Sequence, residues 1–248
     1  MRVALVSDVH GNATALETLV AELDRDPPDA VVCLGDLIQG GPDPGRCLAL
    51  VRERGWPVVL GNADAFVLDA GAAASGVEAV TERQLAQRAW TLQQLDDEQR
   101  AFLTSFPPTV ELGVGPRTLL ACHAVPASYD PVVLPLTPEE EFRAHLEGVE
   151  ADVVAAGHVH LQFVRRAGAT LWVNPGSVGL SYDDEQPEDD FRFDPWGAYA
   201  LLAADEEGRL SVEFRRVPVD VEAIVARVES CGMPGAADGA WRWLARPA

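Results

Sequence analysis

The sequence predicts an α/β fold in which short buried strands alternate with amphipathic helices. The chain has 248 residues, of which 48% are hydrophobic, so it can bury a large core. Residues 1–62 alternate apolar runs with helical patterns in the order β-α-β-α-β. This order favours parallel strands that are joined by right-handed crossovers.

Each expected strand is a short apolar run, and each expected helix has apolar residues at helical spacing. Strands are expected at residues 2–7, 30–34, 57–60, 109–114, 117–121, 152–156, 161–165, 170–173, 198–203 and 210–217. Helices are expected at residues 12–23, 137–147 and 220–228 and across much of 63–106. A further helix is expected after the Gly- and Pro-rich loop 40–45 and should end at about residue 54. Asp96 or Asp97 is expected to cap the last helix before residue 106, and Thr137-Pro138-Glu139-Glu140 has the pattern of a capping box.

We expect one domain, because the sequence shows no internal repeat and no linker. It covers residues 1–248, with a C-terminal helix and tail at about 219–248, where Trp241 and Trp243 are expected to pack on the body. The segment 183–194 is strongly acidic, and its charge predicts a solvated loop. A flap beside the functional site is the alternative interpretation of this segment.

The formal net charge of -20 argues against broad contact with a nucleic-acid backbone, which requires clustered Lys and Arg. A small phosphorylated substrate remains compatible, because bound cations reverse the local field. No apolar stretch approaches the ~20 residues that span a bilayer, and no signal peptide is expected. The four scattered cysteines indicate reduced thiols. We therefore expect a cytoplasmic protein without a membrane segment, and the pattern indicates no oligomeric state.

Polar side chains follow the apolar strands at the points where the strands end. These residues are Asp8, His10, Asp36, Asn62, His123, His158 and His160. In open α/β sheets, ligands bind where the loops at the carboxyl ends of strands converge. Two pairs have members two residues apart, so in extended backbone each pair can offer two ligands to one locus. Carboxylates with neutral imidazoles suit Mn, Fe or Zn better than Ca or Mg.

Four of the five histidines belong to this set, and we expect the fifth, His145, on the surface of a helix. A single buried histidine is usually structural. A whole set of buried polar groups would lack partners unless it bound something. The set therefore predicts a metal site.

The motifs Asp8-Val9-His10, Gly35-Asp36, Gly61-Asn62, His123 and Gly157-His158-Val159-His160 resemble, in this order, those of the calcineurin-like metallophosphoesterase superfamily. The segment Asn174-Pro175-Gly176-Ser177-Val178-Gly179 is similar to that of its small bacterial phosphodiesterase branch. The resemblance runs from Asp8 to about Val217. It implies two mixed β-sheets packed as a sandwich and flanked by helices in four layers.

The resemblance also implies a dinuclear centre, with manganese favoured among Mn, Fe and Zn. Asp8, His10, Asp36 and His160 would hold the first metal, and Asp36, Asn62, His123 and His158 the second, with Asp36 bridging. A hydroxide that bridges the two metals would then attack phosphorus. We expect catalytic roles for Asp36, Asn62 and Asp64, and substrate contacts for Asn62, Ala63 and Ser177.

One motif departs from the family pattern. Many members have Gly-Asn-His followed by Asp or Glu, and their histidine is assigned as the general acid, whereas this chain has Gly61-Asn62-Ala63-Asp64. General acid catalysis typically contributes 10²–10⁴-fold. The leaving group therefore needs little protonation, or another residue replaces the histidine, or alkyl esters react slowly. Ala63 could instead provide room for the substrate.

The expected function is hydrolysis of a small phosphodiester or phosphoanhydride, of the nucleotide or dinucleoside polyphosphate type. A phosphomonoesterase, including a protein phosphatase, is one alternative. A metal-binding sensor without catalysis is another, because Ala63 replaces the usual histidine. A nuclease is disfavoured by the net charge, although Arg165 and Arg166 form a local basic strip.

Overall fold

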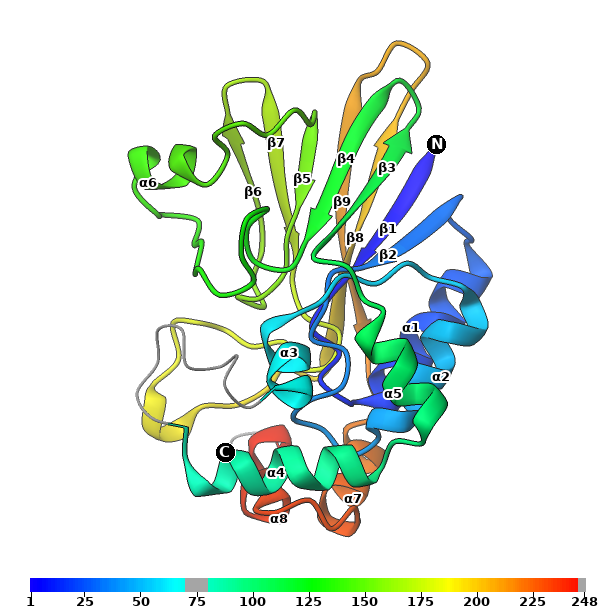
Figure 1. The fold of residues 1–248 in the computed structure, drawn as a ribbon, viewed down its shortest axis with the longest axis vertical. Helices are drawn as coiled ribbons and strands as arrows, with labels where there is room; N and C mark the ends of the chain where they lie inside the picture. The colour runs from blue at the N-terminus through cyan, green and yellow to red at the C-terminus, as the bar shows by residue number, and fades with distance from the viewer. Residues whose placement is uncertain (70–79, 245–248) are drawn as a thin grey trace.

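The computed structural model describes residues 1–69 and 80–244, which form two mixed β-sheets (Figure 1). The first sheet has the order β2-β1-β8-β9, with β1 Arg2–Val6, β2 Ala30–Cys33, β8 Trp196–Ala204 and β9 Leu210–Pro218. The second has the order β3-β4-β5-β7-β6, with β3 Thr109–Val114, β4 Arg117–Cys122, β5 Val153–Ala155, β6 Gln162–Ala167 and β7 Thr170–Pro175. The expected sandwich of two mixed sheets is confirmed.

The purely parallel sheet suggested by the first β-α-β units is only part of the arrangement. β1 pairs in parallel with β2, and β5 pairs in parallel with both β4 and β7. The chain then adds antiparallel neighbours, because β8 pairs with β1 and β9, β3 with β4, and β6 with β7. Short turns join β3 to β4, β6 to β7 and β8 to β9, as antiparallel pairing permits, whereas β1 and β8 come from opposite ends of the chain.

Alternate side chains of β1 point to opposite faces of the first sheet, which explains why this sheet packs against both the second sheet and the helices. Val3 and Leu5 of β1 face the second sheet, whereas Ala4 and Val6 face the helices. Side chains of successive strand residues point to opposite faces, so both faces of this strand are apolar and buried. A third apolar cluster around Trp172 and Phe142 lies on the outer face of the second sheet.

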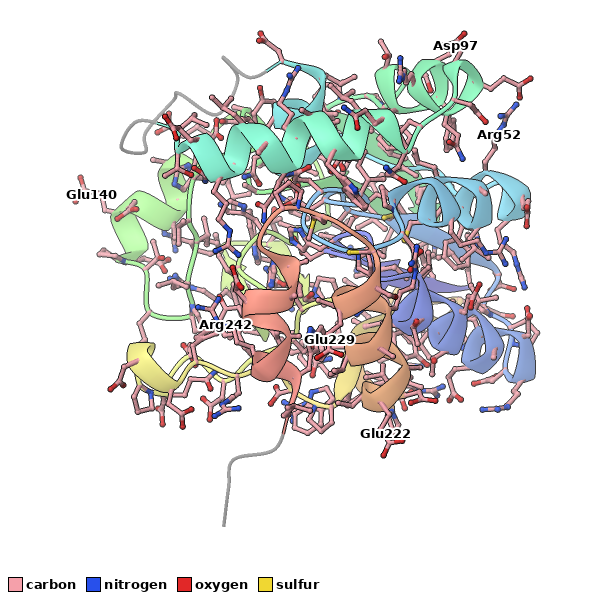
Figure 2. All side chains as sticks on the ribbon, turned by 90° about the horizontal axis from the view of Figure 1, so that it is seen from below. Arg52, Asp97, Glu140, Glu222, Glu229 and Arg242 are labelled. Carbon is pink, nitrogen blue, oxygen red and sulfur yellow. The ribbon has the colours of Figure 1, made fainter. Side chains whose placement is uncertain are left out.

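Helices cover the outer face of the first sheet and one end of the sandwich (Figure 1). They are α1 Ala13–Arg25, α2 Pro44–Arg54, α3 Asn62–Leu68, α4 Glu82–Gln93, α5 Asp97–Thr104, α7 Val221–Ser230 and α8 Ala236–Gly239. A further helix, α6 Glu139–Ala144, lies beside the second sheet, where its Phe142 packs against Trp172 (Figure 1). Asn12, Asp96 and Asp220 cap α1, α5 and α7 through their side chains, as side-chain oxygens do for free N–H groups. Charged side chains such as Glu140 and Glu222 project outward at the periphery (Figure 2).

Three local predictions differ from the structure. Residues 57–60 form only an isolated parallel bridge between Val58 and Cys33. α6 ends at Ala144, three residues earlier than expected, and its N-cap is Pro138 without a side-chain bond. Thr137 does not cap this helix, because its hydroxyl accepts a hydrogen bond from the Leu134 N–H at 2.8 Å. The part of the helical region at residues 70–79 lies outside the described residues.

The C-terminal segment packs on the body as expected at Trp243, which is 8% exposed. All four cysteines are free. No helix among residues 1–69 and 80–244 is both long and apolar enough to cross a lipid bilayer.

Candidate metal centre

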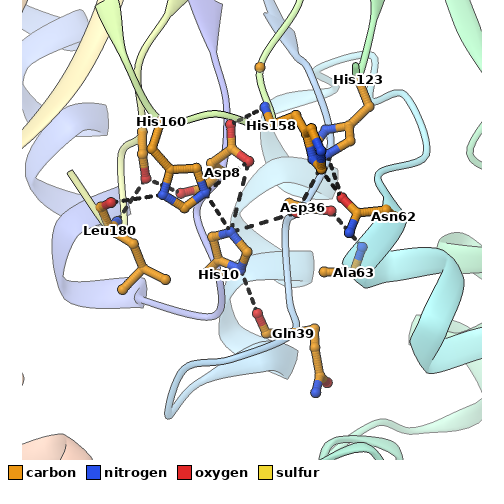
Figure 3. Close-up of polar contacts among 12 residues, drawn as sticks. Asp8, His10, Asp36, Gln39, Asn62, Ala63, His123, His158, His160 and Leu180 are labelled. Atoms are coloured by element: carbon orange, nitrogen blue, oxygen red, sulfur yellow. Dashed lines mark hydrogen bonds and ion pairs between the residues drawn. The ribbon is translucent and has the colours of Figure 1, made fainter. Parts of the chain in front are cut away.

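The first two predicted ligands lie in the loop that follows β1. Asp8 and His10 have left-handed backbone conformations, with φ of 55° and 49°. The Asp8 N–H donates to the Gly35 carbonyl at 3.0 Å, and the His10 N–H donates to the Asp36 carbonyl at 2.8 Å. The loop after β1 is therefore held against the loop after β2, and their side chains face a common space (Figure 3).

Positive φ angles mark this site. Within the described residues, the non-glycine positions with positive φ are Asp8, His10, Asp36, His158 and His160. Such a conformation costs about 1–3 kcal/mol per residue and persists only where the surroundings enforce it. The expectation that the two pairs, Asp8 with His10 and His158 with His160, lie in extended backbone is therefore wrong.

The ligand atoms gather in two clusters. The first cluster is Asp8, His10 and His160, and the second cluster is Asp36, His123 and His158. Within each cluster the ligand atoms lie within 4.8 Å of one another, so each cluster could hold a metal ion. His158 and His160 thus divide between the two clusters instead of serving one locus, whereas Asp8 and His10 both belong to the first cluster.

Asp36 lies between the two clusters. Its Oδ2 is 3.6 Å from His10 Nε2 and 3.5 Å from His123 Nε2. Asn62 adds to the second cluster, because its Oδ1 lies 2.8 Å from His123 Nε2 and 3.0 Å from His158 Nδ1. Seven side chains that are far apart in the sequence therefore converge, as the resemblance implied.

Backbone carbonyls orient the imidazole rings. Three histidines donate through Nδ1, His10 to Gln39 at 2.7 Å, His123 to Leu34 at 2.7 Å and His160 to Leu180 at 2.8 Å. This bond leaves Nε2 with the lone pair that a metal ligand needs. His158 has the opposite orientation, because its Nε2 donates to the Asp130 carbonyl at 3.1 Å and its Nδ1 faces Asn62. Nothing in the sequence pattern pointed to these four carbonyls.

Unpaired groups in the first cluster fit a cation. Asp8 Oδ1 is buried and has no hydrogen-bond partner. It lies 3.3 Å from His160 Nε2, which in turn lies 3.1 Å from His10 Nε2. A buried carboxylate oxygen without a partner is costly, and two imidazole acceptors repel at this distance. A divalent transition metal would satisfy all three atoms, and the donor set of carboxylate and imidazole suits Mn, Fe or Zn.

The electrostatics of the residues also favour positive charge in this space. Burial raises the pKa of Asp36, but the nearby His123 lowers it more, so that this pKa lies well below its usual range. Burial lowers the pKa of His123, but Asp36 raises it to about 9. Asp8 shows the same balance with His160, and its pKa is lowered. The carboxylates are therefore ionised at neutral pH and attract a cation.

Two positions in the motifs require glycine, because neighbouring loops pass too close to them for a Cβ atom to fit. A Cβ atom at Gly61 would collide with the Asp36 side chain and its backbone nitrogen. A Cβ atom at Gly157 would collide with Ser7 Oγ and would lie 2.6 Å from Asp8 Oδ2. The glycine before each ligand thus lets neighbouring loops touch.

Asp64, which we expected to be catalytic, is fully buried behind the second cluster. Its carboxylate accepts hydrogen bonds from the N–H groups of Leu37 at 3.0 Å and Ile38 at 3.1 Å. Burial and the nearby Asp36 raise the pKa of Asp64 to about 7. This geometry favours a role in positioning the loop that carries Asp36. Next to it, the Ala63 N–H donates to Asp36 Oδ1 at 2.8 Å.

Ser177, which we expected to contact substrate, is also fully buried. Its hydroxyl donates to the Asp8 carbonyl at 2.7 Å and accepts from the Leu180 N–H at 2.8 Å. The same hydroxyl thus supports Asp8 and the residue whose carbonyl orients His160. This arrangement favours a supporting role behind the first cluster.

The acidic segment 183–194 is anchored at several points (Figure 1, yellow). Successive ring centroids lie close together, from His160 to Tyr182 at 5.5 Å, to Phe191 at 5.0 Å, to Phe193 at 5.7 Å and to Trp243 at 4.9 Å. The Asp194 N–H also closes the segment by donating to the Ser181 carbonyl at 2.8 Å. Tyr182, which had no motif to mark it, therefore connects the first cluster to the C-terminal segment.

His145 is half-buried at the end of α6 and belongs to neither cluster.

Comparisons with known proteins identify the family of the chain. A family model described as the calcineurin-like phosphoesterase superfamily domain matches residues 1–191. An uncharacterized protein of Methanocaldococcus jannaschii is 24% identical over 243 residues, covering 94% of this chain and 93% of that protein. A symmetrical bis(5'-nucleosyl)-tetraphosphatase of Pectobacterium carotovorum is 41% identical over 71 residues, but this match covers only 27% of this chain and 25% of that protein.

A solved structure shows the same fold. The metallophosphoesterase from Sphaerobacter thermophilus is 23% identical, with a TM-score of 0.72 over 98% of this chain and 99% of that chain. The matching family model covers most of the chain, and each of the two clusters could hold a metal ion. The chain therefore belongs to the calcineurin-like phosphoesterase superfamily and is a metal-dependent phosphoesterase.

Proposed function

We propose that the protein hydrolyses a small phosphodiester or phosphoanhydride with two divalent transition metal ions, of which manganese is favoured. The observation that carries this proposal is the place of Asp36. Its Oδ2 lies within 3.6 Å of a histidine nitrogen from each cluster. A carboxylate in this position can serve two metals at once, which is the arrangement of two-metal hydrolases.

Bound metals would neutralise charge on the phosphoryl group and supply an activated water for in-line displacement. Asp8, His10, Asp36 and His160 would hold the first metal, and Asp36, Asn62, His123 and His158 the second. The His158 N–H donates to Asp8 Oδ2 at 3.0 Å, and the Ser177 hydroxyl holds the Asp8 backbone carbonyl, so this ligand is positioned before substrate arrives. Preorganised ligands of this kind reduce the reorganisation that the reaction requires.

The surroundings support a substrate with groups on both sides of the phosphorus. One cavity of about 390 Å³ includes His160 in its lining, and another of about 420 Å³ includes His123 and Asp130. One cavity therefore adjoins the first cluster, and the other adjoins the second. A phosphodiester or phosphoanhydride has two substituents to place there, whereas a monoester has one.

Ala63 supports the same class of substrate. It occupies the position of the usual histidine, and it offers only its N–H group, which is bonded to Asp36. Leaving groups of low basicity depend least on a proton donor. Nucleotide phosphates are of this kind, and the short similarity to a tetraphosphatase agrees with such a substrate.

We also propose that the protein acts in the cytoplasm on small substrates, without broad nucleic-acid binding. The net charge of -20 and the four free cysteines support this proposal. Arg165, part of the basic strip considered above, donates to the Thr137 carbonyl at 2.7 Å and lies over the Phe142 ring. It supports the loop before α6, which weakens the case for a nuclease.

The test compares two substrates with the manganese-loaded protein. We expect faster turnover of bis-p-nitrophenyl phosphate than of an unactivated alkyl monoester, since the diester has two substituents and a good leaving group. Faster turnover of the alkyl monoester would contradict the proposal and favour a phosphomonoesterase. Stoichiometric metal without hydrolysis of either ester would favour a metal-binding sensor.

A further inference from the structure

A cavity of about 390 Å³ begins at the first cluster and lies at the facing edges of the two sheets. This volume is near the lower limit of the ~300–1,000 Å³ found for small-molecule sites. The residues that define its chemistry are His160, Asp183, Asp184, Asp194, Trp196 and Arg216. His160 is also a ligand of the first cluster, so a substituent of a phosphoryl group at the metal centre can extend directly into the cavity.

Several polar groups of the lining are already engaged within the protein. The Tyr182 hydroxyl donates to the Val159 carbonyl at 3.1 Å, and the Ser181 hydroxyl donates to the Ser177 carbonyl at 2.5 Å. The Gln162 amide donates to the Tyr199 carbonyl at 3.0 Å. These groups are therefore committed to the fold and do not determine what the cavity accepts.

Carboxylates and one guanidinium remain for a ligand. Asp183, Asp184 and Asp194 line the cavity, and the structure shows no side-chain hydrogen bond from a described residue to Asp184 or Asp194. Arg216 donates through Nε to Gln162 Oε1 at 3.2 Å and lies 5.0 Å from the centre of the Trp196 ring. No described residue accepts from its two terminal amino groups. The cavity thus offers strong acceptors, one charged donor and an aromatic surface.

The charge balance decides between candidate substituents. Three carboxylates against one guanidinium make the cavity net negative. A second phosphate group would be repelled by nearby carboxylates, and low-dielectric walls strengthen such repulsion. A hydroxyl group donates to a carboxylate and accepts from a guanidinium, and it carries no charge. Charge-assisted bonds of this type are about twice as strong as neutral ones.

We propose that the cavity beside His160 binds a neutral polyhydroxyl substituent of the phosphoester, such as a glycerol or sugar moiety. Asp184 and Asp194 accept from its hydroxyl groups, Arg216 donates to them, and Trp196 packs against its carbon atoms. This inference rests on the proposed phosphoesterase function and narrows its substrate class. It favours a phosphodiester of a polyol over a substrate that would place a further phosphate in this cavity.

The test uses two inhibitors that differ only in hydroxyl groups. Glycerol 3-phosphate and propyl phosphate carry the same phosphate and a three-carbon chain. Each is measured as a competitive inhibitor of bis-p-nitrophenyl phosphate hydrolysis by the manganese-loaded protein. We expect the inhibition constant of glycerol 3-phosphate to be about tenfold lower, as one or two net hydrogen bonds to charged groups would give.

The variant Asp184→Ala/Asp194→Ala should reduce this tenfold ratio to about one, and the corresponding double Asn variant should give an intermediate ratio. Asp189→Ala is the matched control, because it removes a charge from the same segment without lining the cavity. Its ratio should equal that of the unchanged protein.

The outcomes separate this inference from the proposed function. If the unchanged protein hydrolyses the diester but does not distinguish the two inhibitors, the cavity assignment is wrong and the phosphoesterase proposal stands. An unchanged tenfold ratio in the double Ala variant would equally overturn the assignment. Absence of diester hydrolysis in the unchanged, metal-loaded protein would overturn the proposed function itself.

Discussion

The two clusters contain similar numbers of ligands but differ in charge. The first cluster has Asp8 to itself and lies next to Asp36, whereas the second has Asp36 and the neutral amide of Asn62. Two imidazoles complete each set. If both metals share Asp36, the first metal gains one full negative charge more than the second. Coulomb attraction therefore favours tighter binding at the first cluster, and the second metal should exchange more readily.

The clusters also differ in how they are supported. Behind the first cluster, Ser177 fills the space between Asp8 and Leu180 with a fully buried hydroxyl. Behind the second, the support comes from Asp64, which holds backbone N–H groups of the loop after Asp36. Substitutions can therefore weaken one cluster at a time, which makes the comparison testable.

The largest effect is expected for Asp36→Asn, which changes the residue between both clusters. Loss of this charge should weaken both metals and lower kcat/KM for bis-p-nitrophenyl phosphate by about 1,000-fold or more, as the loss of several kcal/mol implies. Metal content by mass spectrometry and steady-state kinetics measure the effect. Asp189→Asn, on the exposed acidic segment, is the control. Retention of both metals and of activity would show that Asp36 does not join the clusters.

Exchanging charge between the clusters should reverse their order of affinity. Asp8→Asn should weaken the first metal by roughly 100-fold, and Asn62→Asp should tighten the second by roughly 10-fold, because each tenfold step corresponds to about 1.4 kcal/mol of charge interaction. Calorimetric titration with Mn²⁺ resolves the two steps. Equal affinities in the unchanged protein, with no response to either substitution, would remove the charge difference as an explanation.

Ser177→Ala should weaken the first metal selectively. Removing a group that supports a metal ligand typically costs about 10–100-fold in metal affinity. The second metal should be bound as before, which the same titration shows. Ser230→Ala, on the exposed part of α7, removes a hydroxyl that is bonded only to nearby helix carbonyls and should change neither step. Equal weakening of both metals would mean that Ser177 supports the whole site and not one cluster.

Asp64→Asn should have the smallest effect on metal binding. An amide keeps one acceptor oxygen but replaces the other with a donor, which faces an N–H group. We expect a loss of about 1–3 kcal/mol in the free energy of unfolding, as for a buried group that loses its bond. Activity should fall only about threefold, less than the 10–100-fold typical for a group that bonds a metal ligand directly, because Asp64 bonds backbone N–H groups and no ligand side chain. A loss as large as that of Asp36→Asn would restore a direct catalytic role for Asp64.

Much of the site could be predicted because each of several ligands comes at the end of a strand that the sequence marks as an apolar run. Asp8, Asp36 and His123 each come directly after an apolar run, and the sheets bring the ends of these runs together. A capping pattern also predicted Asp96 or Asp97 as the cap of the helix before residue 106, and Asp96 is the N-cap of α5. Local sequence and tertiary structure agree at these positions.

The parts that could not be predicted depend on contacts between distant segments. The His158 N–H donates to Asp8 Oδ2, 150 residues away, and no local pattern distinguishes the left-handed backbone of His158 and His160 from extended backbone. Burial of Ser177 depends on its contact with Asp8, 169 residues away. The bridge at Val58 and the short α6 are likewise set by tertiary packing, which overrides local propensity.

Anomalous scattering from crystals soaked in Mn²⁺ tests the central claim most directly. The account predicts two peaks, one within each cluster, with Asp36 Oδ2 in contact with both and the first peak fully occupied at the lower Mn²⁺ concentration. A single peak at any concentration, or two peaks that do not share Asp36, would contradict it.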